Sequence, residues 1–219
     1  KMADTVDEIS DGRLILGLGA GYHKLEYDMF GHPYDHRVGR FEEGIQIIHG
    51  LLRDGQVDFE GKFYFARECE LKPRGPRKNG CPILIGTCKP RMGALMAKYA
   101  DQWNAYYDDT FNKVDGVRRL KPIIDGYCEK EGRDPATLER TCTILIADDS
   151  ADPWWDRLPS DQYAEEGHLV PVNGAPEQIA EVMLEYQSAG ISHVQVCIEP
   201  TNLETIEAFA QVLELLDKS

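Results

Sequence analysis

The chain has 219 residues, of which 38 are acidic and 24 are basic, and its formal net charge at pH 7 is −14. Such an acidic surface repels nucleic-acid phosphates and anionic lipids, so we expect neither a nucleic acid nor a membrane as partner. No apolar run approaches the length of a membrane span. The six cysteines are scattered without a C-x-x-C pair, a pattern typical of reduced thiols in a cytoplasmic protein.

The N-terminal quarter of the sequence predicts a helix, a strand and a second helix. Lys1–Ser10 places apolar residues on one helical face without an N-cap, which indicates the end of a helix that begins upstream. Leu14–Leu18 is a short apolar run without alternation, as expected for a strand buried on both faces of a parallel sheet. A polar loop is then expected over His23–Gly39, followed by an amphipathic helix over Arg40–Leu52.

The next segment predicts a hairpin and then a regular alternation of strands and helices. Val57–Phe65 is expected to turn at Glu60-Gly61, and Lys72–Gly80, rich in proline, glycine and basic residues, is expected to be an exposed loop. The later strands are predicted at Pro82–Gly86, Gln102–Tyr106, Thr141–Ala147 and His193–Ile198, and the helices at Pro90–Ala100, Phe111–Glu131, Gly174–Ala189 and Leu203–Leu216.

Five strand–helix units follow the incomplete helix at the start of the chain. They predict an α/β protein, specifically a (β/α)8 barrel without its first three units. A complete barrel usually has about 250 residues, so roughly 80 to 90 residues would be missing. We expect one partial-barrel domain over residues 1–219, with a polar insertion at about residues 148–173.

At this point the sequence resembles the bacterial-luciferase-like family of flavin- and deazaflavin-dependent oxidoreductases. Short stretches carry the resemblance, and they follow one another in the family's order. They are Asp7–Arg13 running into Leu16–Gly21, Arg40–Glu43, Phe59–Tyr64, Pro82–Gly86, Lys98–Asn104 and Gly174–Ala180.

The resemblance implies a barrel that binds coenzyme F-420 or flavin mononucleotide (FMN) at the carboxyl ends of its strands. It implies hydride transfer or monooxygenation of a small organic substrate by a cytoplasmic enzyme, as a homodimer. Because the family's first strands supply part of the redox site, this chain alone is expected to be inactive. The alternative is a non-catalytic, truncated barrel remnant that binds phosphate ligands or pairs with a partner chain.

The glycine-rich stretch after the first strand is one candidate for cofactor binding. We assign Gly19, Gly21 and Tyr22 to a loop that faces the cofactor, with Tyr22 near the ring or the substrate. A dinucleotide fingerprint is the weaker interpretation, because it needs a helix directly after the glycines and a third glycine at the right spacing. A tight turn without a ligand is the remaining alternative.

The turn between the second strand and its helix is the stronger candidate. Here Ile85 and Gly86 end a strand, Thr87 offers a hydroxyl, and Lys89 and Arg91 stand at the start of a helix that begins near a proline. A helix N-terminus attracts anions through its free N–H groups and its dipole, so we expect the cofactor phosphate here. The alternative is an ordinary capped helix with two solvated cations.

Other candidate residues have weaker support. Trp154 and Trp155 are assigned to a substrate lid, although they can equally anchor the insertion to the barrel. His32 and His36 have the spacing of a helical metal pair, but an intervening proline and the lack of a third ligand argue against a metal, and none is predicted. Cys88 next to the phosphate turn is interpreted as a packed or idle cysteine rather than a reactive thiol.

Of the two cofactors, coenzyme F-420 is preferred, partly because two of the stretches resemble the deazaflavin branch of the family more closely. The acidic tail of F-420 requires an exit lined by cations. The densest basic cluster of the chain, which a solvated loop explains almost as well, comprises Lys72, Arg74, Arg77 and Lys78.

Overall fold

The computed structural model describes residues 1–148, 150–152 and 169–218. By their internal contacts these residues form two compact units. One comprises Lys1–Gln102 with Tyr127–Leu138, and the other Trp103–Gly126 with Glu139–Ser219. The prediction of a single domain with an insertion stays a prediction, and Trp154 and Trp155 lie outside the described residues. None of the described helices has the length and apolar character needed to cross a membrane.

The first unit contains two parallel strands, a separate hairpin and the helices between them. Its elements are α1 (Met2–Ile9), β1 (Leu16–Gly17), α2 (Lys24–Met29), α3 (Arg37–Asp54), β2 (Gln56–Glu60), β3 (Phe65–Glu70), β4 (Ile83–Gly86), α4 (Pro90–Tyr99) and the 3₁₀ turn η1 (Pro135–Thr137). Strand β1 pairs with β4 in parallel, with Leu16 opposite Ile83 and Gly17 opposite Leu84. Fully buried side chains of the core in this unit include Ile45 on α3, Ile83 and Ile85 on β4, and Met96 on α4.

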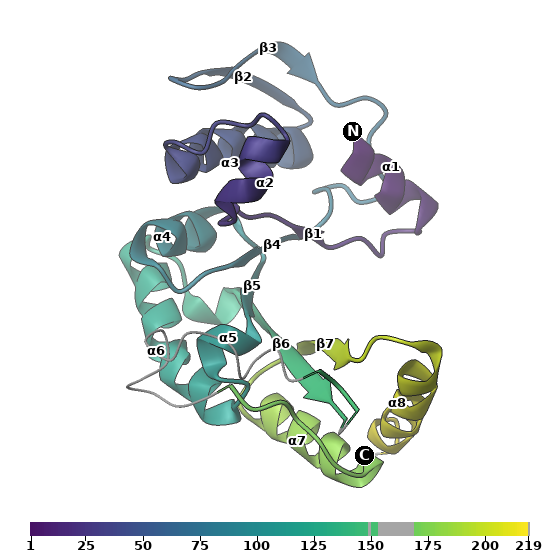
Figure 1. Ribbon diagram of the computed structural model, residues 1–219. Coiled ribbons are helices and arrows are strands. Elements are labelled where there is room, and N and C mark those ends of the chain that lie inside the picture. The colour runs from purple at the N-terminus through teal and green to yellow at the C-terminus, as the bar shows by residue number, and fades with distance from the viewer. Residues whose placement is uncertain (149, 153–168, 219) are drawn as a thin grey trace. The chain divides into compact units, whose positions relative to one another are not determined.

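Strands β2 and β3 form an antiparallel hairpin, as expected, which packs against α3 (Figure 1). Its second strand begins at Phe65, where the predicted hairpin ends, and the turn occupies residues 61–64 rather than Glu60-Gly61 alone. A single carboxylate fixes its turn, because Glu43 on α3 accepts hydrogen bonds from the backbone N–H groups of Lys62, Phe63 and Tyr64 at 2.8, 2.8 and 2.9 Å. Burial acts to raise the pKa of Glu43, but these donors and the nearby Arg40 outweigh it, so the pKa lies below its usual value. The hairpin is therefore held to α3 by a charged group as well as by packing.

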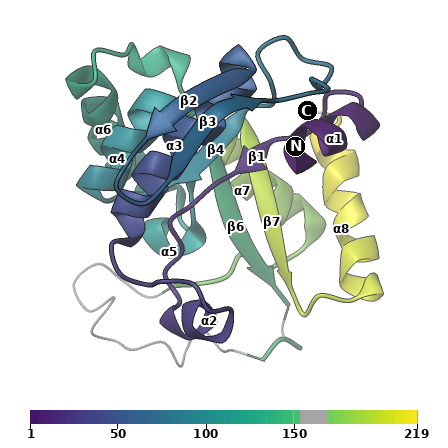
Figure 2. The same ribbon diagram turned by 90° about the horizontal axis from the view of Figure 1, so that it is seen from above.

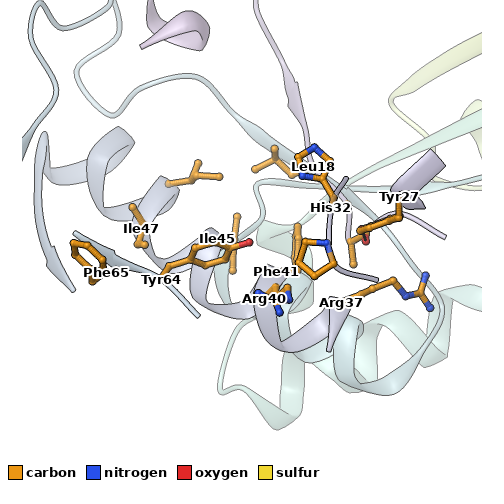
Figure 3. Close-up of a pocket in the computed structure, with 15 residues that line it drawn as sticks. Leu18, Tyr27, His32, Arg37, Arg40, Phe41, Ile45, Ile47, Tyr64 and Phe65 are labelled. Carbon is orange, nitrogen blue, oxygen red and sulfur yellow. Dashed lines mark hydrogen bonds between the residues drawn. The ribbon is translucent and has the colours of Figure 1, made fainter. Parts of the chain in front are cut away.

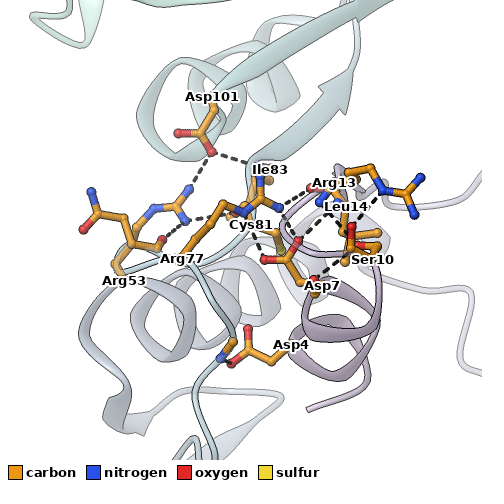
Figure 4. Close-up of polar contacts among 12 residues, drawn as sticks. Asp4, Asp7, Ser10, Arg13, Leu14, Arg53, Arg77, Cys81, Ile83 and Asp101 are labelled. Atoms are coloured by element: carbon orange, nitrogen blue, oxygen red, sulfur yellow. Dashed lines mark hydrogen bonds and ion pairs between the residues drawn. The ribbon is translucent and has the colours of Figure 1, made fainter.

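A buried ion pair holds the segment that leads into β1 (Figure 4). Asp7 on α1 is fully buried, and its carboxylate accepts from Arg77 Nε at 2.9 Å and from Arg77 Nη2 at 2.5 Å. The same carboxylate accepts from the backbone N–H of Leu14 at 3.1 Å, while Arg77 donates to the carbonyl of Leu14. Both backbone groups of Leu14 are thereby fixed two residues before β1 begins.

The second unit holds the later strands and their helices. Its elements are β5 (Gln102–Ala105), α5 (Tyr107–Thr110), α6 (Val114–Lys130, whose last residues belong to the first unit), β6 (Glu139–Ala147), α7 (Pro176–Ser188), β7 (His193–Glu199) and α8 (Leu203–Leu216). Strands β6 and β7 pair in parallel from Thr141 opposite His193 to Ala147 opposite Glu199. Figure 2 shows β6 and β7 side by side, with α7 beyond them and α8 alongside β7. Parallel strands joined by helices are the α/β architecture that the sequence predicts.

The first strand, predicted over Leu14–Leu18 and buried on both faces, comprises only Leu16–Gly17, of which Leu16 is half-buried and Gly17 exposed. In two further places the structure differs from the prediction because tertiary contacts decide local structure. The expected polar loop at His23–Gly39 contains α2 and the start of α3, and Tyr27 on α2 donates its hydroxyl to the carbonyl of Ala20. The helix expected over Phe111–Glu131 begins only at Val114, as α6, and the short helix α5 precedes it, because Phe111 and Asn112 between them adopt positive φ angles of 53° and 56°. The amide of Asn112 holds that break in place by bonding both backbone groups of Leu145.

Candidate functional site

The carboxyl ends of β1 and β4 lie next to each other, because the two strands pair in parallel. The backbone N–H of Leu18 donates to the carbonyl of Leu84 at 2.9 Å, so the pairing continues one residue beyond β1. The glycine stretch that follows β1 and the turn that follows β4 therefore leave the sheet at the same edge. In parallel α/β folds this edge is where ligands bind.

The glycine stretch is shaped by close contacts with α2 and α3. Gly21 has a positive φ of 67°, and a Cβ atom there would lie 2.8 Å from the hydroxyl oxygen of Tyr27, so only glycine fits without rearrangement. Its carbonyl accepts from Arg37 Nη1 at 2.6 Å. Gly19 lines a cavity, whereas Tyr22 is 85% exposed and does not line it. The structure thus places Gly19 at the cavity and the side chain of Tyr22 outside it.

The turn after β4 has the form expected of a helix N-terminus. Ile85 is fully buried, and Gly86 is the last residue of β4. The hydroxyl of Thr87 accepts from the backbone N–H of Lys89 at 3.1 Å, and Lys89 is the N-cap residue of α4, without a capping bond from its side chain. The side chain of Ile85 belongs to the core, so it is not accessible to a ligand.

Arg91, the second cation of this turn, already has a partner. Its Nη2 atom lies 2.7 Å from Oε2 of Glu42, which joins α4 to α3. The side chain of Arg91 is 62% exposed, so an anion can reach it from solvent. An anion bound at this turn must either share the guanidinium with Glu42 or displace the carboxylate.

A cavity of about 550 Å³ lies beside the end of β1, within the first unit (Figure 3). It is bounded by the glycine stretch, α2, α3 and the hairpin. Its lining residues are Leu18, Gly19, Ala20, Tyr27, His32, Pro33, Arg37, Arg40, Phe41, Gly44, Ile45, Ile47, Ile48, Tyr64 and Phe65. Among the residues that the structure describes, this lining contains two arginines and a histidine but no carboxylate.

The basic cluster at residues 72–78 has a structural role that sequence reasoning missed. Arg77 forms the buried ion pair with Asp7, and Arg74 donates from Nη2 to the carbonyls of Leu52 and Lys78 at 2.7 and 3.3 Å. Lys72 pairs with Glu70 at 2.5 Å. The cluster therefore loses most of its support as an exit for an acidic cofactor tail.

The cavity-lining cations were also not singled out from the sequence. Arg37 lies in the segment interpreted as a polar loop, and Arg40 is the first residue of a predicted helix and part of a family stretch. The sequence pattern that could have identified them is the pair Arg37 and Arg40, three residues apart and next to Phe41, because residues at this spacing share a helix face. His32 also lines the cavity, whereas His36 is the N-cap residue of α3.

A family profile described as luciferase-like monooxygenase matches residues 1–168, more than half of the chain. The chain belongs to this family. The match includes both the glycine stretch and the turn before α4, and it confirms the family resemblance that the short stretches predict.

Among curated proteins, the pyrimidine monooxygenase RutA of Agrobacterium fabrum is 30% identical over 160 residues, covering 71% of this chain and 43% of that protein. Similar enzymes from Methylorubrum match the whole chain at 28% identity, over 59% of their own length. The chain thus spans about half the length of the curated relatives it matches.

Solved structures with the same fold include the EDTA monooxygenase EmoA from Chelativorans sp. BNC1, with a TM-score of 0.75 and 15% identity over 99% of this chain and 68% of that one. An F-420-dependent secondary alcohol dehydrogenase, in complex with an F-420–acetone adduct, has a TM-score of 0.74 and 17% identity over 98% of this chain and 73% of that one. These likenesses confirm the predicted fold class, part of a luciferase-like (β/α)8 barrel.

Proposed function

We propose that the complete protein is an oxidoreductase that binds a flavin or deazaflavin cofactor at the edge formed by β1 and β4. The cofactor phosphate binds at Gly86–Arg91 and the tricyclic ring lies along the stretch from Gly19 to Tyr22. The parallel pairing of β1 with β4 carries this proposal, because it brings the two segments together at the ligand-binding edge. The monooxygenase names of the relatives support monooxygenation of a small organic substrate.

The residues at the turn fit a phosphate. The first N–H groups of α4 point out of the helix without a side-chain cap, and its dipole favours a negative charge there. Thr87, Lys89 and Arg91 add a hydroxyl and two cations, of which Arg91 can bind two phosphate oxygens at once. The cofactor, when bound, supplies the redox chemistry, while these residues anchor and orient it.

The proposal is made for the chemistry that FMN and F-420 share, a tricyclic ring next to a phosphate. The preference for F-420 rested partly on the basic cluster, in which Arg77 and Arg74 are engaged in holding the fold. Among the relatives, two structures are of F-420-dependent enzymes and others carry the name monooxygenase, so they support neither cofactor over the other.

Titration of the complete protein with FMN and with F-420, followed by the change in cofactor fluorescence, tests the proposal. We expect Arg91→Ala to weaken binding by about 1.5 kcal/mol, the lower end for a charge-assisted hydrogen bond, because the side chain is largely exposed. Glu42→Gln is expected to tighten binding, since it removes the competing carboxylate. Lys98→Ala, at the other end of α4, is the matched control.

Unchanged affinity in Arg91→Ala, or an equal loss in Lys98→Ala, would show that the turn is an ordinary helix start without a bound phosphate.

The proposal also places the enzyme in the cytoplasm, which six cysteines without a disulfide support. Its assembly as a homodimer is tested by sedimentation of the complete protein.

A further inference from the structure

We infer that the cavity beside β1 is a binding site for a small organic anion with an apolar body. The chain as a whole carries 38 acidic and 24 basic residues, yet the described residues that line this cavity include Arg37 and Arg40 and no carboxylate. A concave site with cations on a low-dielectric wall concentrates anions, and here it does so on a protein that repels them elsewhere.

The two arginines are held in place without using all their donors. Arg37 donates from Nη1 to the carbonyl of Gly21, and its guanidinium lies 4.4 Å from the ring centre of Tyr34. Arg40 donates from Nε to the carbonyl of Asp35 at 3.1 Å, and its guanidinium lies 4.5 Å from the ring centre of Phe63. A guanidinium has five N–H donors, so both can also bind a carboxylate.

A ligand carboxylate must compete with the carboxylate of Asp35 for the guanidinium of Arg40. The Asp35 carboxylate lies 3.4 Å from Nη2 of Arg40, but its side chain is 62% exposed and it does not line the cavity. An exposed ion pair at this distance contributes little free energy. A ligand carboxylate that approaches from the cavity can therefore compete with it for Arg40.

The remaining wall defines the body of the ligand. Phe41 and Ile47 on α3 contribute an apolar surface, and Tyr64 and Phe65 of the hairpin extend it with aromatic rings (Figure 3). The volume of about 550 Å³ lies in the range of small-molecule sites. A carboxylate on an aromatic or branched aliphatic body matches both the cations and this wall.

The cavity shares Gly19 with the stretch proposed for the cofactor ring, but none of the residues from Gly86 to Arg91, proposed for the cofactor phosphate, lines it. Naming the anion as the substrate rests on the proposed function. The binding of the anion does not, and it can be measured without any cofactor.

The probes are 4-fluorobenzoate and its neutral isostere 4-fluorobenzamide, titrated into the complete, cofactor-free protein and followed by ¹⁹F NMR. We expect the acid to bind about tenfold more tightly than the amide, as for one charge-assisted hydrogen bond. Arg40→Met should abolish this preference while keeping the apolar stem, and Arg40→Lys should retain part of it. Arg118→Met, an exposed arginine of the second unit, should leave it unchanged.

Equal affinity for the two probes, failure of the acid to bind, or an unchanged preference in Arg40→Met would each overturn the inference. Arg91→Ala separates this site from the cofactor site: the acid should bind as in the parent protein. Loss of acid binding in Arg91→Ala would place the anion at the phosphate turn and refute the cavity site, whereas loss of cofactor binding alone leaves it standing.

Discussion

Replacing Arg77 by methionine should lower the free energy of unfolding more than the same change at an exposed arginine does. The substitution keeps the apolar stem and removes the guanidinium that pairs with Asp7, whose side chain is 0% exposed. The carboxylate would keep only its bond from the backbone N–H of Leu14, at 3.1 Å. A charge left buried without its counter-ion is costly because water cannot solvate it.

The size of the effect follows from the burial of the two partners. Removing one partner of a buried ion pair typically costs about 3–5 kcal/mol. The side chain of Arg77 is 30% exposed, which lets some water reach the site, so we expect a loss near the lower end, about 3 kcal/mol. That is a large share of the 5–15 kcal/mol by which domains are usually stable.

Urea unfolding of the complete protein, with the slope held constant between variants, measures the loss. Arg13→Met is the matched control, because Arg13 is an exposed neighbour that bonds only Ser10 O among the described side-chain bonds, and it should change the free energy by less than about 0.5 kcal/mol. The double variant Asp7→Leu/Arg77→Met should be more stable than Arg77→Met alone, since it removes the stranded charge. Equal effects at Arg77 and Arg13, or additive losses in the double variant, would refute the reasoning.

Three further substitutions test the first unit. Glu43→Gln removes the charge that holds the hairpin turn, so amide hydrogen exchange at residues 62–64 should accelerate while exchange in α4 does not. Burial, reinforced by Arg53, lowers the pKa of His49, so its protonation favours the unfolded state. The contribution of neutral His49 to stability is fully present above the unfolded pKa of about 6.5. The urea midpoint of the parent should therefore fall as the pH drops below that value, and His49→Gln should reduce the fall. Gly93→Ala places a Cβ atom 2.3 Å from the Tyr127 ring, and overpacking of about 1–3 kcal/mol should outweigh the roughly 1 kcal/mol gained in helix propensity, lowering the melting temperature.

Periodicity located most of the regular elements because it reflects which face of each element is buried. The terminal helix α8 has the predicted bounds, Leu203–Leu216, and α4 ends one residue before its predicted end. Helix α2 could not be found this way, because none of its residues is buried, so no apolar stripe marks it. It depends instead on single contacts such as that of the Tyr27 hydroxyl with Ala20, which a local pattern does not encode.

Charges in the sequence were harder to interpret than apolar residues, because a charge shows its role only through its partner. Arg77 stands in a loop rich in basic residues, and its partner Asp7 is 70 positions away. The same limit applied to Arg91, whose pairing with Glu42 spans 49 positions. Local composition predicted a solvated cluster, whereas the fold uses Arg77 and Arg74 to bind carboxylate and carbonyl oxygens.

The start of α3 connects the parts of the candidate site. Consecutive residues of a helix point about 100° apart, so Arg40, Phe41, Glu42 and Glu43 must face different neighbours. Arg40 and Phe41 line the cavity, Glu42 holds Arg91 at the start of α4, and Glu43 fixes the hairpin turn. One helical turn therefore contributes to the cavity wall, pairs with the cation at the start of α4 and fixes the aromatic hairpin. Each of these contacts needs its own side-chain chemistry, so the four residues of the stretch Arg40–Glu43 cannot replace one another.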